Sequence, residues 1–141
     1  MRSDELIQIN LDTISDIKYL CRAWISQPRE RAGGIISFNG TYRLGSSGSD
    51  DALFMKWKID EFSEIREPFR IHGLVVDLTD LNYQWGEDLD TSSRRLMAAG
   101  KPVLNVIRPE AFDTFSGVID RRHIRTNLDQ AVNEVNRYLT G

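Results

Sequence analysis

The stretch Gly73-Leu-Val-Val-Asp-Leu78 is the strongest strand signal in the chain. Its nearly continuous apolar run is typical of a strand that is covered on both faces of a parallel sheet. A second apolar run, Val103-Leu-Asn-Val-Ile107, predicts a neighbouring buried strand. Between the two we expect a helix from about Asp88 to Ala99, which Gly100 and Pro102 terminate.

On the N-terminal side of this strand, the pattern predicts an amphipathic helix that ends before Pro68. Ser49 or Asp50 can cap it, after a glycine- and serine-rich run at 45–49 that is typical of a flexible loop. One apolar stripe defines its buried face: Ala52, Met55, Ile59, Phe62 and Ile65.

Further toward the N-terminus, Asn39-Gly40 predicts a hairpin turn between strands at 35–38 and 41–44. Residues 6–11 alternate weakly and predict a short strand. A helix is expected to start at Asp12 or Thr13 and to end at Pro28, because four apolar residues recur at three- and four-residue steps: Ile14, Ile17, Cys21 and Trp24. Cys21 is the single cysteine, and a buried, inert thiol is the favoured interpretation.

At the other end of the chain, Asn127-Leu-Asp-Gln130 resembles a capping box and predicts a last helix with one apolar face. These elements together predict an α/β fold, with a mostly parallel (mixed) sheet of four to six strands and amphipathic helices packed on it. We expect one domain over residues 1–141, made of an N-terminal strand and helix extension (1–33) and a core (34–141).

The composition excludes several classes of protein. The chain has 141 residues and a formal net charge of -3, so no global positive field favours nucleic acid. No apolar run approaches the roughly 20 residues that a membrane span needs. With no signal-peptide pattern at the start of the sequence, we expect a cytoplasmic protein.

No catalytic or metal-binding pattern is recognisable. The two histidines, His72 and His123, lie in no zinc-ligand spacing, and there is no G-x-S-x-G elbow. The acidic residues near Asp77 and at 87–90 could hold Mg²⁺, but carboxylates at a helix start are the favoured interpretation. We therefore predict no catalytic residue, no metal and no cofactor.

The segment from Gly34 to Leu139 resembles STAS domains, the family of anti-sigma-factor antagonists and of the cytoplasmic tails of anion transporters. Val75-Val-Asp-Leu-Thr79 is similar to the central strand of the family, and the run 124–131 is similar to the start of its closing helix. Regulatory members carry a phosphorylatable Ser or Thr after this strand. Trp85-Gly-Glu-Asp88 stands there instead, so the resemblance implies a regulatory domain without that phosphoswitch.

A rival resemblance is to the crotonase/ClpP-like superfamily. Residues 83–89 are similar to its Phe-x-x-Gly-x-Asp-Leu turn, which implies an oxyanion-hole role for Gly86. The chain is much shorter than a crotonase, and Arg108-Pro109-Glu110 replaces the second oxyanion segment. This alternative therefore implies a pared-down acyl-CoA hydratase or hydrolase relative.

The favoured prediction is a non-catalytic regulatory or protein-interaction domain whose partner is another protein. The predicted partner-binding residues follow the central strand: Tyr83, Trp85, Gly86, Glu87 and Asp88. A secondary basic patch at Arg121, Arg122 and Arg125 could meet an acidic partner or a phosphate. A homo-oligomer and an inhibitor or immunity-type role remain open alternatives.

Overall fold

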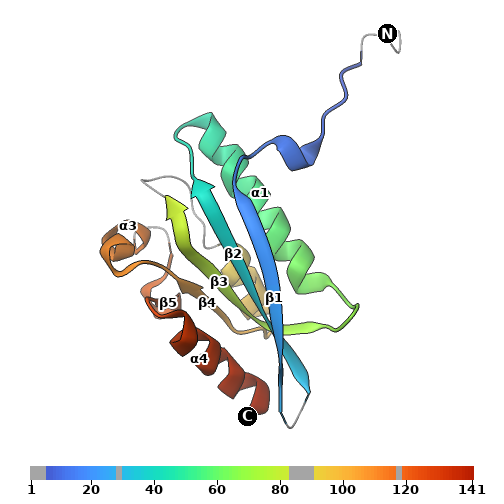
Figure 1. Cartoon of the computed structure of the whole chain (residues 1–141), viewed down its shortest axis with the longest axis vertical. Coiled ribbons are helices and arrows are strands. Elements are labelled where there is room, and N and C mark those ends of the chain that lie inside the picture. Colours follow the sequence, from blue (N-terminus) through green and yellow to red (C-terminus); the bar gives the residue numbers. More distant parts are fainter. Residues whose placement is uncertain (1–5, 28–29, 83–90, 117–118) are drawn as a thin grey trace.

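The computed structural model describes residues 6–27, 30–82, 91–116 and 119–141, and these residues form an α/β fold (Figure 1). Five strands form one mixed sheet in the order β1-β2-β3-β4-β5. β1 pairs antiparallel with β2, and the other neighbours are parallel. Their bounds are Lys18–Ser26 (β1), Arg31–Thr41 (β2), Ile71–Asn82 (β3), Val103–Val106 (β4) and Ile124–Arg125 (β5). The predicted fold class is confirmed, and the predicted strand at 73–78 lies in the central β3.

Helices cover both faces of the sheet (Figure 1). α1 (Ser46–Glu64) and α2 (Thr91–Ala98) pack on one face, and α4 (Leu128–Thr140) packs on the other. Shorter helical segments connect them: η2 (Leu11–Thr13), η3 (Pro109–Ala111), α3 (Phe112–Phe115) and η4 (Arg121–His123). The Asn127 side chain caps α4 by accepting a hydrogen bond from the Gln130 amide, as the capping box predicts.

The alternation of side chains along β3 divides the core into two layers. Leu74, Val76 and Leu78 are fully buried on the α1 side, where the predicted helix stripe meets them. Val75 points the other way, into a second cluster with the predicted apolar face of α4: Ala131, Val135 and Leu139. The apolar faces that the sequence predicts for these two helices are therefore confirmed.

The helix predicted from Asp12 or Thr13 is wrong. Residues 18–26 form β1, which pairs with β2 from Lys18↔Asn39 to Ser26↔Arg31. The helix-like spacing of its apolar residues does not correspond to a buried helix face, because β1 is an edge strand that buries few of its side chains. The prediction of a buried thiol is wrong for the same reason, since Cys21 is exposed on this strand. Residues 18–33, assigned from the sequence to an extension, contribute β1 and the start of β2 to the sheet.

The hairpin predicted at Asn39-Gly40 is also wrong, because both residues lie inside β2. Gly40 has φ +119 and lies beside the register shift between Ser37 and Asn39, so its conformational freedom accommodates an irregular ladder rather than a turn. α1 begins at Ser46, earlier than the predicted caps, with Gly45 at the N-cap.

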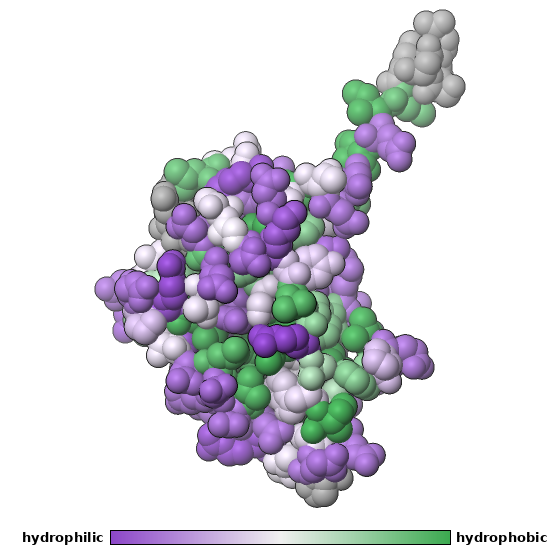
Figure 2. Space-filling model, viewed as in Figure 1, coloured by the Kyte–Doolittle hydropathy of each residue, from purple (hydrophilic) through white to green (hydrophobic). Residues whose placement is uncertain are grey.

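Residues 6–11 do not form the predicted strand; Leu11 opens η2 and the residues before it are irregular. Figure 2 shows hydrophobic surface on the projecting N-terminal segment. Four large apolar side chains of this segment are exposed: Leu6, Ile7, Ile9 and Leu11.

Candidate functional site

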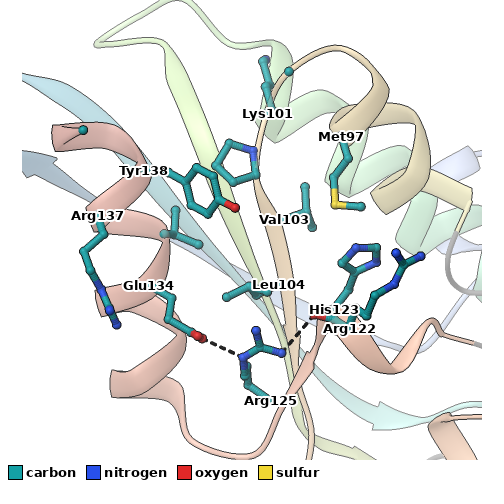
Figure 3. A pocket seen from close by; sticks show the side chains of 14 residues that line it. Met97, Lys101, Val103, Leu104, Arg122, His123, Arg125, Glu134, Arg137 and Tyr138 are labelled. Carbon is teal, nitrogen blue, oxygen red and sulfur yellow. Dashed lines mark hydrogen bonds and ion pairs between the residues drawn. The ribbon is translucent and has the colours of Figure 1, made fainter.

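A groove of about 840 Å³ opens beside β4, at the edge of the sheet (Figure 3). It exists because β5 pairs only with Asn105 and Val106. The first half of β4, Val103 and Leu104, therefore has no neighbouring strand on this side among the residues that the structure describes. α2 and α4 wall the groove, and the segment 122–125 closes one end. A groove of this volume, between helices at a sheet edge, is within the usual size range of ligand sites.

Apolar side chains line the middle of the groove. Leu104 is half-buried at its base, while Met97 from α2 and Val135 from α4 lie on its sides. Tyr138 of α4 lies on the rim with 72% of its surface exposed. Exposed tyrosine beside an apolar surface is typical of binding interfaces, because the ring buries a large area and the hydroxyl can still bond.

Arg125 is the fixed cation of the groove. Its Nε donates to Glu134 Oε2 at 2.7 Å and its Nη1 to the Arg122 carbonyl at 3.0 Å (Figure 3). Nη1 also donates to the Ile124 carbonyl at 2.8 Å. Both side chains of the pair are about three-quarters buried, at 27% and 26% exposure. This pair joins β5 to α4, so we assign Arg125 a structural role at the groove wall.

Arg122 is the accessible cation at the same end. Its guanidinium contacts Asp120, with Nη2 to Oδ2 at 2.7 Å, but 82% of the Arg122 side chain is exposed. Hydrogen bonds from the Arg122 side chain and backbone amide lower the pKa of Asp120 far below its usual range. An exposed pair of this kind contributes little stability, so Arg122 can exchange Asp120 for another anion at little cost.

Two further cations have no carboxylate within ion-pair distance among the described residues. Lys101 Nζ donates to the Ser63 carbonyl at 2.7 Å, and Arg137 Nε donates to the Asn133 carbonyl at 3.5 Å. Burial and the nearby Arg70 lower the pKa of Lys101, opposed by Glu64. Both cations line the groove, which is therefore positively charged.

His123 adds a polar atom without a partner. Its Nδ1 is buried and makes no hydrogen bond to any residue that the structure describes. The His123 carbonyl accepts a hydrogen bond from Asn105 Nδ2 at 3.4 Å, which holds the backbone against β4.

The predicted partner-binding residues after β3 lie outside the described residues: Tyr83, Trp85, Gly86, Glu87 and Asp88. The secondary basic patch is divided. Arg122 and Arg125 line the groove, whereas the Arg121 guanidinium lies over the Phe112 ring, 5.8 Å from its centroid. Sequence reasoning missed Lys101, Leu104, Arg137 and Tyr138, because nothing in the linear pattern places α4 next to β4.

Of the acidic residues predicted as a possible magnesium site, those at 87–90 lie outside the described residues, and Asp77 is hydrogen-bonded within the sheet. Asp77 accepts hydrogen bonds from the Ser37 and Thr79 side chains across β2 and β3. Over the described parts of the chain, no three His, Cys, Asp or Glu side chains cluster closely enough to hold a metal ion.

Comparisons with known proteins assign this chain to no family. Neither a protein-family model nor a curated protein matches this sequence. Within the described ranges, no helix combines the length and the apolar character that crossing a membrane requires.

Proposed function

We propose that this chain is a non-catalytic protein-interaction domain, and that the groove beside β4 receives a segment of its partner. The observation that carries the proposal is the combination of an apolar base at Leu104 with an exposed aromatic rim at Tyr138. Apolar surface with an exposed aromatic anchor is the usual composition at the centre of a protein interface.

The regulatory part of this proposal rests on the resemblance of residues 34–139 to STAS domains. The resemblance itself remains a prediction, and so does a cytoplasmic location.

Tyr138→Ala tests the groove. A peptide library displayed on phage is selected on the folded domain, and the recovered peptides are measured against the wild type and the variant. We expect the variant to bind about thirtyfold more weakly, which corresponds to the roughly 2 kcal/mol typical of an aromatic anchor. Because Tyr138 is largely exposed, the melting temperature should hardly change.

Leu44→Ala is the matched control, since Leu44 is another exposed apolar residue (50%) that does not line the groove. It should bind the peptides like the wild type. A library that yields no groove-dependent peptide, or a Tyr138→Ala variant that binds all recovered peptides as well as the wild type, would refute the proposed site.

A further inference from the structure

Through Lys101, the groove adjoins a second group of basic residues at the amino ends of β2, β3 and β4. Ala32 pairs with Ile71, and the Leu74 amide donates to the Pro102 carbonyl at 2.9 Å. This register brings the starts of the three strands together, with the basic residues that lie in or just before them: Arg31, Arg70, His72 and Lys101. Burial lowers the pKa of His72, and Arg31, Arg70 and Lys101 lower it further, which is the signature of cations gathered in one place.

This concentration of positive charge contrasts with the whole chain, whose net charge is -3. Among the described residues that line the groove, Glu134 is the one with an acidic side chain, and Arg125 pairs with it. Lys101 and Arg137 donate to backbone carbonyls and Arg122 pairs with Asp120, so the described lining of the groove keeps an excess of positive charge. Complementary charge selects a partner and accelerates its association.

The cations are spaced around an apolar centre. In Figure 3, Lys101 lies at one end of the groove and Arg122 with His123 lies at the other, while Val103 and Leu104 lie between. Arg137 and Tyr138 add a cation and an aromatic ring from α4. An extended chain offers side chains at regular steps, so one apolar side chain can meet Leu104 while acidic residues before and after it meet the two charged ends.

Resting on the proposed function, we infer that the partner segment is an extended acidic peptide, in which glutamate or aspartate residues flank an apolar residue. Nucleic acid is the less suitable occupant, because a phosphate backbone gains nothing from the apolar base at Leu104.

The test uses a synthetic fluorescent peptide in which Leu-Val-Leu is flanked on each side by two glutamates, and the same peptide with glutamine in place of every glutamate. Fluorescence anisotropy measures their binding to the wild-type chain, to Arg122→Glu and to Arg137→Glu. Arg22→Glu is the matched control, because Arg22 is an exposed arginine of β1, at the opposite edge of the sheet.

We expect each groove variant to bind the glutamate peptide about fivefold more weakly, which is the upper range for one exposed ion pair, and the control to bind it like the wild type. The glutamate peptide should also bind more weakly as salt rises from about 0.05 to 0.3 M. Equal binding of the glutamate and glutamine peptides would overturn the acidic specificity but leave the groove as a protein-binding site. Tighter binding of an oligothymidine than of the glutamate peptide would overturn the choice of partner.

Discussion

Asp51 is the most constrained charged residue in the described chain. It is fully buried at the start of α1, and its carboxylate accepts hydrogen bonds from three groups: Ser15 Oγ at 2.5 Å, the Arg43 amide at 2.8 Å and the Arg43 guanidinium at 2.9 Å. Arg43 also donates to the Ile14 carbonyl. One carboxylate therefore joins the segment before β1, the connection after β2 and α1.

The Asp51 interactions predict a specific acid sensitivity. Burial raises the pKa of Asp51, but the hydrogen bonds from Arg43 and Ser15 outweigh it, so the net pKa is lowered. A carboxyl whose pKa is lower in the folded state stabilises the fold above its unfolded value near 4, and this contribution is lost as the pH falls below that value.

We expect Asp51→Asn to lower the free energy of unfolding by about 2 to 3 kcal/mol at neutral pH, because it replaces one acceptor oxygen by an NH2 donor and removes the negative charge that Arg43 pairs with. Urea titrations at about pH 6 and pH 3 measure the difference between the variant and the wild type, which should shrink at the lower pH. The exposed neighbour Asp50 gives the control, and Asp50→Asn should change stability by less than about 0.5 kcal/mol. A pH-independent difference would contradict the assignment.

Cys21 shows how a wrongly predicted helix leads to a wrong prediction of side-chain burial. Partial burial and the nearby Glu61 raise the pKa of its thiol, while Lys58 opposes them. The thiol is therefore mostly protonated at neutral pH and a weak nucleophile, although it is exposed rather than buried.

At the scale of elements, Trp24 connects β1 to α4, in addition to the pairing of β1 with β2. The Trp24 indole lies directly over Gly33 of β2, and its Nε1 donates to Asn136 Oδ1 of α4 at 3.0 Å. A Cβ at Gly33 would lie 2.2 Å from the Trp24 Cζ2 atom, so the ring occupies the space that any side chain would need. Gly33 is thus required for close approach between an edge strand and the helix layer.

Gly33→Ala should therefore displace the Trp24 ring and cost about 2 kcal/mol of stability, as overpacked sites typically do. A double-mutant cycle with Trp24→Ala isolates the cause: in that background Gly33→Ala should cost less than about 0.5 kcal/mol. Equal costs in both backgrounds, measured by urea unfolding, would show that the glycine serves another purpose.

The elements that could be predicted from the sequence are those whose own residue pattern indicates which side chains are buried. β3 and β4 are continuous apolar runs, and α4 combines a cap with an apolar face. β1 could not be predicted, because its nine residues are mostly exposed and their conformation comes from pairing with β2. Asn39-Gly40 carries a hairpin signal, but pairing with β3 keeps it within a long strand.

At the scale of the whole molecule, the groove depends on the shortness of one strand. β5 has two residues, so the sheet ends unevenly and α4 overhangs an uncovered part of β4. The sequence places Arg122 and Arg125 in a basic run, but it does not reveal that Lys101, more than twenty positions earlier, lines the same surface. That proximity arises only from the parallel arrangement of β3, β4 and β5.

The claim that this groove is the partner site is tested most directly by hydrogen–deuterium exchange of the whole chain, with and without the glutamate-flanked peptide. We expect slower exchange in segments that line the groove, at 101–104, 122–125 and 134–138, and no change in β1. Slower exchange confined to residues 83–88, with the groove segments unchanged, would contradict the account and would return the partner site to the turn after β3.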